Sequence, residues 1–290
     1  MSVVATNAEP VSRFYTSQGL KLHYNDWGNE RAPLLLLVHG MRDHARCWDW
    51  VALALRDRWH VVAPDLRGHG DSQWSPDGAY INPYHAFDVT ELIDLLGHDQ
   101  VTIVGHSFGG NVCARYAAIY PERVRRLVLV DALGPSDDKM SGWATEPVTR
   151  TRDWIEKRRG VMARAARRFP DLEEAVARMG DANPHLTAQQ ARHLAIHGVR
   201  RFDDGYGWKY DPQLSIFMPE DFLLDGKMFW REITAPTLLC WGPESWTINP
   251  ETSGRAAAFR QHRTQVFEGA GHWLHHDRLD DFLSTLNEFL

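Results

Sequence analysis

The sequence predicts an α/β protein with a mostly parallel sheet, and three features of the 290-residue chain support this prediction. Short apolar runs alternate with helix-like segments from residue 13 to residue 134, as in successive β-α-β units. The alternation stops over residues 135–232, and it resumes over residues 233–290. We therefore expect one α/β core formed by 1–134 and 233–290, interrupted by a mostly α-helical cap at 135–232.

The composition is typical of a globular protein whose overall charge attracts neither nucleic acid nor an anionic membrane. Hydrophobic residues make up 43% of the chain, and the formal net charge is −6. The three cysteines, Cys47, Cys113 and Cys240, are scattered and form no disulfide or zinc-binding pattern. No apolar run approaches the length of a membrane span, and residues 1–10 lack the pattern of a signal peptide. We therefore expect a cytoplasmic protein without a membrane span.

The elements before the insertion are indicated by their apolar patterns. Residues 13–17 and 20–25 are typical of two strands joined by a turn at Gln18 and Gly19. The unbroken apolar run at 33–38 suits a strand that is buried on both faces. Further strands are expected at 59–63, 101–104 and 124–130, and helices at 48–56, 84–96 and 111–120. In such sheets, ligands bind beyond the carboxyl ends of the strands.

The insertion shows helical spacing without strand alternation. Helices are expected at 149–168, 171–179 and 188–198. Residues 150–168 include eight basic and two acidic residues, which favours a solvated helical face and leaves an anionic substrate or membrane surface as the alternative. Beyond the insertion, strands are expected at 236–241 and 264–267, and helices at 251–259 and 279–290.

The stretch from Gly105 to Gly109, Gly-His-Ser-Phe-Gly, lies between an expected strand and an expected helix. A sharp strand-to-helix turn of the form Gly-x-Ser-x-Gly exposes the serine hydroxyl at the tip of the strand. Glycines are needed there because the neighbouring chain passes too close to leave room for a Cβ atom. The sequence therefore predicts Ser107 as a nucleophile.

A serine hydroxyl needs a neighbouring base, and the base needs a third group that orients it. His272 is the best candidate base among fifteen histidines, because it follows the last expected strand in a glycine-rich turn. His275 and His276 are expected to face solvent. For the third group, Asp131 and Glu244 both follow strands close to that of the serine, and the residues alone do not choose between them.

A tetrahedral intermediate needs two preorganised N–H donors for its negative charge. The backbone N–H of Phe108, directly after Ser107, is expected to be the first donor. The turn at His39, Gly40 and Met41 follows another strand, and Met41 N–H is expected to be the second. His39 and His106 are expected to bond to backbone atoms.

The chain resembles the α/β-hydrolase fold superfamily over nearly its whole length outside the insertion. The resemblance is carried by the motifs His39-Gly40, Pro64-Asp-Leu-Arg-Gly-His-Gly-Asp-Ser72, Gly105-His-Ser-Phe-Gly-Gly110, Val128-Leu-Val-Asp131 and Gly269-Ala-Gly-His272. It implies an eight-stranded, mostly parallel sheet flanked by helices, with the cap inserted after the sixth strand. The superfamily order of nucleophile, acid and histidine is also satisfied.

One position departs from the family pattern. Members usually carry Asp after the seventh strand, where this chain has Ser245. A one-residue contraction would bring Glu244 into that role, whereas other members place the acid after the sixth strand, where Asp131 stands. We favour Asp131 as the acid and keep Glu244 as the alternative.

The resemblance implies hydrolysis by acyl transfer to water, because Ser107 excludes the alkyl-ester chemistry of superfamily members with a carboxylate nucleophile. We expect a carboxylesterase that cleaves an apolar or moderately polar carboxylic ester, lactone or thioester, without a cofactor or metal. The alternatives are a C–C bond hydrolase of the same fold and a receptor-like ligand-binding protein with low turnover. For the assembly, a homodimer is an alternative to a monomer.

The cap is expected to select the substrate. Seven residues are candidates for the substrate pocket, and they are His39, Trp143, Trp154, Trp208, Trp230, Trp246 and Trp273. Aromatic side chains of this kind line apolar ligand sites, although most cap aromatics are expected to pin the cap to the sheet instead.

Overall fold

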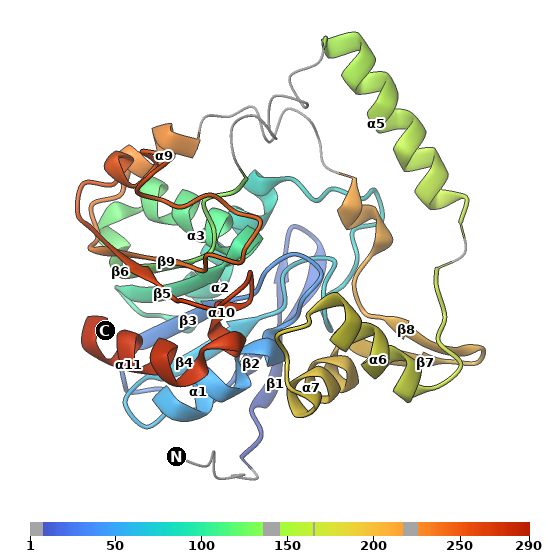
Figure 1. Ribbon diagram of the computed structural model, residues 1–290, viewed down its shortest axis with the longest axis horizontal. Coiled ribbons are helices and arrows are strands. Elements are labelled where there is room, and N and C mark those ends of the chain that lie inside the picture. Colours follow the sequence, from blue (N-terminus) through green and yellow to red (C-terminus); the bar gives the residue numbers. More distant parts are fainter. Residues whose placement is uncertain (1–7, 136–145, 165, 217–225) are drawn as a thin grey trace.

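The computed structural model describes residues 8–135, 146–164, 166–216 and 226–290. Its main sheet has eight strands in the order β1-β2-β4-β3-β5-β6-β9-β10 (Figure 1). The strands are β1 (Val11–Ser17), β2 (Leu20–Asp26), β3 (Leu34–Val38), β4 (His60–Pro64), β5 (Val101–His106), β6 (Val124–Val130), β9 (Thr237–Trp241) and β10 (His262–Val266). Strand β2 is antiparallel to both of its neighbours, and every other pairing is parallel. The predicted eight-stranded, mostly parallel sheet is confirmed.

Helices cover both faces of the sheet, and the alternation of side chains along β3 shows why. Leu34 and Leu36 belong to the core on one face, whereas Leu35 and Leu37 belong to the core on the other. All four side chains are at most 1% exposed. A strand that is buried on both faces therefore has an unbroken apolar sequence.

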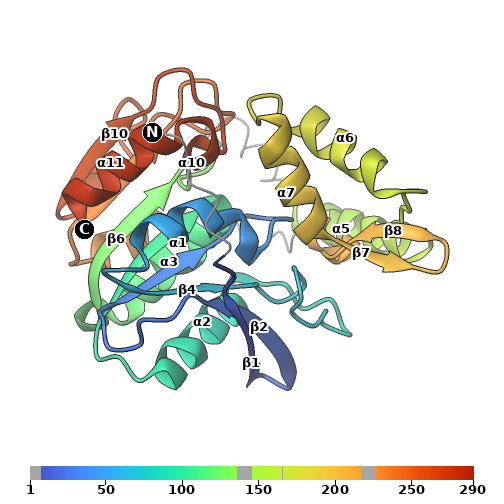
Figure 2. The same cartoon turned by 90° about the horizontal axis from the view of Figure 1, so that it is seen from below.

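The two cores are closed by different helices (Figures 1 and 2). The first contains side chains of α2 (Asn82–Leu96), α3 (Ser107–Ile119) and α9 (Gly226–Glu232). The second contains side chains of α1 (Asp49–Leu55) and α11 (Leu279–Phe289). The thiols of Cys47, Cys113 and Cys240 are buried in these cores, as small apolar side chains are.

The segment between β6 and β9 contains more than helices. Its helices are α5 (Pro147–Met162), α6 (Leu172–Ala182) and α7 (Ala188–Gly198), and a 3-10 turn at Pro212–Ser215 precedes α9. A two-stranded hairpin, β7 (Val199–Phe202) with β8 (Gly205–Trp208), follows α7. The sequence did not predict this hairpin, because each strand has only four residues, which is too few to show a clear alternation of apolar and polar side chains. Figure 2 shows α6, α7 and the hairpin together as one group beside the sheet.

Helix α7 begins as its sequence dictates. The Thr187 hydroxyl accepts from Gln190 N–H, and the Gln190 side chain accepts from Thr187 N–H, so both form a capping box. Helix α5 lies on the surface of the molecule, and none of its residues is buried. It also ends at Met162 rather than at the predicted residue 168.

The helix predicted at 251–259 is wrong. The structure has turns there, with a single 3-10 turn at Ala256–Ala258. Gly254 adopts φ +70°, a left-handed conformation that interrupts a helix. Asn249 also bonds through its side chain to the N–H groups of Glu251 and Thr252, which favours a turn.

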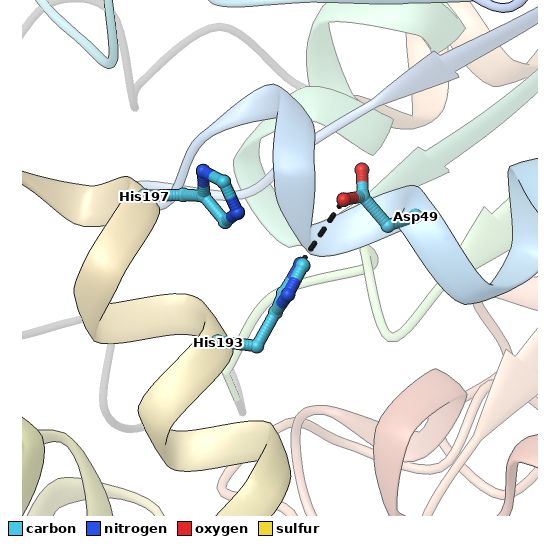
Figure 3. A group of neighbouring side chains, drawn as sticks. All are labelled: Asp49, His193 and His197. Atoms are coloured by element: carbon cyan, nitrogen blue, oxygen red, sulfur yellow. Dashed lines mark ion pairs between the residues drawn. The ribbon is translucent and has the colours of Figure 1, made fainter. Parts of the chain in front are cut away.

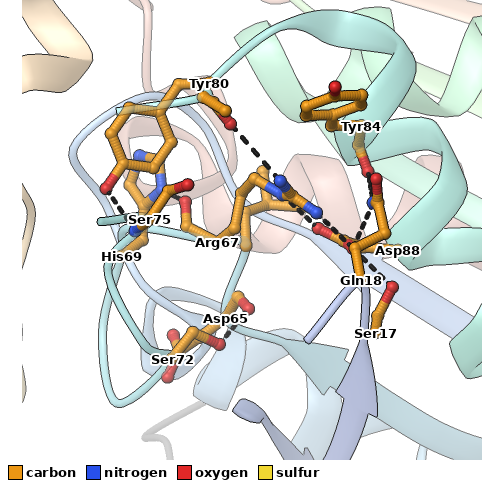
Figure 4. A network of polar contacts seen from close by, with 12 residues as sticks. Ser17, Gln18, Asp65, Arg67, His69, Ser72, Ser75, Tyr80, Tyr84 and Asp88 are labelled. Atoms are coloured by element: carbon orange, nitrogen blue, oxygen red, sulfur yellow. Dashed lines mark hydrogen bonds and ion pairs between the residues drawn. The ribbon is translucent and has the colours of Figure 1, made fainter. Parts of the chain in front are cut away.

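The polar loop after β4 is held by a buried network (Figure 4). Arg67 donates two hydrogen bonds to Asp88, at 2.6 and 2.7 Å, and both side chains are almost fully buried. Ser17 Oγ donates to the same carboxylate at 2.6 Å. The network ties this loop to β1 and α2, and so explains why a charged loop stays ordered at the edge of an apolar core.

No helix in the described ranges is long and apolar enough to cross a membrane.

Candidate active site

Ser107 lies at the junction of β5 and α3, and its backbone has φ +50°. This left-handed conformation is strained for a residue with a side chain, and it persists only where the surroundings enforce it. The surroundings here are tight: a Cβ atom on Gly109 would lie 2.2 Å from the carbonyl oxygen of His39. One on Gly105 would lie 2.7 Å from Gly110 Cα. The glycines of the motif thus allow the sharp turn.

The structure brings three side chains into one line at the carboxyl ends of the strands. His272 Nε2 lies 2.9 Å from Ser107 Oγ. On the other side of the ring, His272 Nδ1 lies 2.5 Å from Asp131 Oδ2. Asp131 follows β6 directly and is 3% exposed. An imidazole held in this way can take a proton from the hydroxyl while the carboxylate orients it.

Asp131 receives further hydrogen bonds from the segment after β9. Ser245 Oγ donates to its Oδ2 at 2.5 Å, and Thr247 Oγ1 donates to its Oδ1 at 2.5 Å. The residue at the position where family members usually carry the acid, Ser245, therefore supports the carboxylate that comes from the neighbouring strand. Hydroxyl donors on both oxygens fix the orientation of the carboxyl group against His272.

Glu244 lies elsewhere. Its carboxylate is 55% exposed, and its Oε2 lies 3.4 Å from His185 Nε2. The structure thus places Asp131 against His272 and turns Glu244 toward the loop between α6 and α7.

The expectation that His275 and His276 face solvent is wrong. They are 0% and 4% exposed, because the short helix α10 (Leu274–Asp277) packs down against the core. The His275 ring stacks on Trp48 at a centroid distance of 4.5 Å. Burial lowers the pKa of His275 well below its usual value, and it lowers that of His276 to about 4. Both rings are therefore neutral at neutral pH.

His106 and His39 bond to backbone atoms, as the sequence predicts. His106 Nε2 lies 2.8 Å from the carbonyl oxygen of His272, which ties the histidine loop to the serine turn. His39 accepts a hydrogen bond from Leu66 N–H at 3.0 Å and donates to the Gly40 carbonyl at 2.7 Å. His39 is fully buried, and it is not among the residues that line the pocket beside His272.

The expected oxyanion donors lie close to Ser107. Phe108 is in the first turn of α3, where backbone N–H groups have no partner within the helix. A Cβ atom on Gly40 would lie 3.2 Å from Ser107 Cβ, so the turn that contains Met41 lies directly against the serine. The helix N-terminus adds a partial positive charge on the same side.

A pocket of about 180 Å³ opens beside His272. Trp246, which is 51% exposed, lies 4.9 Å from the His272 ring between centroids, and Trp273 lies 5.0 Å from it on another side. The remaining lining includes Glu244, Asp277, Ala182 at the end of α6, and the loop residues Asn183, Pro184 and His185. No motif in the sequence marked residues 183–185, because a loop outside the core carries no periodic signal.

Three other predicted pocket tryptophans, Trp154, Trp208 and Trp230, do not line this pocket. Trp230 is 6% exposed and stacks on Phe259 at 5.4 Å within the core, so its assignment to the pocket is wrong. Trp208 packs edge-on against Phe169 at 5.2 Å. Trp154 is on α5 beneath the guanidinium of Arg158. Trp143 lies outside the described residues.

Comparison with known proteins places this chain in a family. The family model of the alpha/beta hydrolase fold matches residues 33–279, so the chain belongs to the alpha/beta hydrolase fold family.

Particular relatives are similar to this chain over different lengths. A serine hydrolase-like protein from Danio rerio is 31% identical over 66% of this chain, and the match spans only 58% of that relative's length. A 3-hydroxybutyrate-oligomer hydrolase from Cupriavidus necator is 30% identical, over 85% of this chain and 84% of its own. Among solved structures, E-2-(acetamidomethylene)succinate hydrolase has a TM-score of 0.81 at 23% identity, covering 97% of this chain and 98% of that one. That structural similarity concerns the fold alone.

Proposed function

We propose that this protein is a serine hydrolase that cleaves carboxylic esters through an acyl-enzyme intermediate. The observation that carries the proposal is the continuous set of contacts from Ser107 Oγ through His272 to Asp131 at a strained strand-to-helix turn. Each group stands where the reaction needs it.

In the first half of the reaction, Ser107 Oγ attacks the ester carbonyl carbon while His272 Nε2 takes the hydroxyl proton. The negative charge that develops on the carbonyl oxygen is stabilised by the N–H groups of Phe108 and Met41. Asp131 stabilises the imidazolium that forms. The C–O bond to the alcohol then breaks, and His272 returns the proton to the leaving oxygen.

In the second half, water replaces the alcohol. His272 takes a proton from the water as its oxygen attacks the acyl carbon, and it gives the proton back to Ser107 when the ester bond to the enzyme breaks. The products are the carboxylic acid and the free enzyme, and no cofactor enters this scheme.

For the substrate, we propose a small ester that is moderately polar at one end. Trp246 and Trp273 offer apolar surface beside His272, whereas His185, Glu244 and Asp277 offer polar groups in the same pocket. Similarity to a hydrolase of 3-hydroxybutyrate oligomers supports a short hydroxyacyl ester. Because residues 182–185 line this pocket, we also propose that 135–232 acts as a cap on a core formed by 1–134 and 233–290.

The experiment is hydrolysis of p-nitrophenyl esters from acetate to longer acyl chains by the native protein and by Ser107→Ala. We expect turnover by the native protein, a preference for short chains given the small pocket, and loss of turnover in the variant. A native protein that hydrolyses no ester would contradict the proposal and favour a C–C bond hydrolase or a receptor-like protein.

A further inference from the structure

A second group of polar side chains lies where α7 meets α1, apart from Ser107. His193 and His197 are four residues apart on α7, so both project from one side of the helix toward Asp49 (Figure 3). One donor atom from each of the three residues lies within 4.8 Å of the other two. His193 Nε2 is 3.1 Å from Asp49 Oδ2.

One carboxylate oxygen in this group has no hydrogen-bond partner. Asp49 is 4% exposed, and its Oδ1 is buried without a hydrogen-bond partner. Buried carboxylate oxygens are normally satisfied, so an unpartnered one points to a missing group. His193 and His197 are partly buried, and a neutral imidazole can offer a ring nitrogen to a metal ion.

Two imidazoles and one carboxylate are a donor set that suits Zn²⁺ and similar divalent transition metals, with water as a fourth ligand. Zinc–ligand bonds of about 2.0–2.1 Å place two tetrahedral ligands roughly 3.4 Å apart. The three side chains thus need only small rotations to close on an ion. The geometry points to a divalent transition-metal site formed by Asp49, His193 and His197, which joins the segment between β6 and β9 to the core.

Arg46 is the competitor for this site. Its Nε donates to Asp49 Oδ2 at 2.6 Å, and its other end bonds to Glu9 at 2.6 Å. A bound cation would repel this guanidinium, which keeps Glu9 as a partner when it moves. The site should therefore bind metal more tightly when the charge of Arg46 is removed.

The test is titration of the chelator-treated full chain with ZnCl₂, followed by calorimetry and thermal unfolding. We expect one equivalent of Zn²⁺ to bind and, at a hundredfold excess over the dissociation constant, a rise in Tm of about 5 °C. His193→Ala and His197→Ala should each weaken binding by at least about 100-fold. Arg46→Gln should strengthen it several-fold.

Two controls separate this site from other histidines. His262→Ala, on an exposed strand end, should bind like the native protein. His272→Ala should also retain the one equivalent, because His272 lies in the candidate active site. Loss of binding in His272→Ala, unchanged binding in His193→Ala, or no binding to the native chain would each overturn the inference.

Discussion

Two regions of this molecule contain the same sequence of contacts from serine to histidine to aspartate. At the pocket, His272 lies 2.9 Å from Ser107 and 2.5 Å from Asp131. At the edge of the sheet, His23 Nε2 lies 2.9 Å from Ser12 Oγ, and its Nδ1 lies 2.7 Å from Asp65 Oδ2. By these distances alone the two sets are nearly indistinguishable.

What surrounds the serines is different. Ser107 has φ +50° and begins a helix, so unpaired N–H groups lie beside its hydroxyl. Ser12 lies within the edge strand β1, and its backbone is not left-handed. Asp65 also accepts from the N–H groups of Ala45 and Asp71, so its carboxylate organises loops. The comparison teaches that a reactive serine needs preorganised donors for an oxyanion in addition to a base and an acid.

The sharpest way to break this comparison is to remove each serine hydroxyl. Ser107→Ala should lower kcat for p-nitrophenyl acetate by about 10⁶-fold, because the nucleophile is lost. Ser12→Ala should leave kcat within about twofold. Circular dichroism of both variants controls for folding. A large loss of activity in Ser12→Ala would mean that Ser12, His23 and Asp65 take part in catalysis.

Substitution of the acids comes next. Asp131→Asn should lower kcat by about 10⁴-fold, because an amide cannot stabilise the imidazolium. Glu244→Gln, the matched change at the alternative acid, should stay within about threefold. The measurement is steady-state kinetics of the two variants. A larger loss of kcat in Glu244→Gln than in Asp131→Asn would identify Glu244 as the acid.

In the second group, Ser12, His23 and Asp65, the change from Asp to Asn should lower the stability of the fold. Asp65→Asn removes one partner of a buried pair and should lower the free energy of unfolding by about 3–5 kcal/mol. Urea unfolding at pH 5 measures this. Residual activity per folded molecule should be close to native, and a selective loss of kcat in the folded variant would contradict a purely structural role.

The contact between Asp65 and His23 also predicts that the free energy of unfolding depends on pH. Burial by itself raises the pKa of Asp65, but the hydrogen bond and charge of His23 outweigh it, so the pKa lies well below its usual value. The stabilisation is therefore complete above the unfolded-state pKa of about 3.9 and is lost as the pH falls toward the lower folded-state pKa. The difference in unfolding free energy between native protein and Asp65→Asn should shrink by about 0.7 kcal/mol from pH 5 to pH 3.5. An unchanged difference would mean that Asp65 is not ionised in the fold.

The smallest expected effect on catalysis concerns the hydroxyl that supports Asp131. Ser245→Ala removes a hydrogen bond to a charged acceptor and should lower kcat about tenfold with little change in KM. Ser245→Thr keeps a hydroxyl and should restore most of the rate. If Ser245→Ala raised KM instead, the side chain would act on substrate binding rather than on the position of the carboxylate.

Much of the fold followed from local signals in the sequence. The apolar run of β3 and the glycines around Ser107 reflect constraints that act over a few residues, namely burial on two faces and a turn without room for Cβ atoms. The family match is in accord with the predicted fold class. The hairpin of β7 and β8 and the turns at 251–259 were not predicted, because strands of four residues and single turns are too short to show a clear periodic pattern.

What the tertiary structure alone decided is which distant side chains meet. The sequence named Ser107 and His272 from their turns, but it favoured Asp131 over Glu244 only through the family resemblance. The contact between Asp131 and His272, which are 141 residues apart, comes from the fold. The sheet order sets β6 beside β9, which brings Ser245 and Thr247 onto Asp131. The burial of His275 and His276 and the approach of α7 to Asp49 likewise depend on packing. Spacing along a chain constrains neighbours on one element, whereas contacts between elements follow from how the whole core closes.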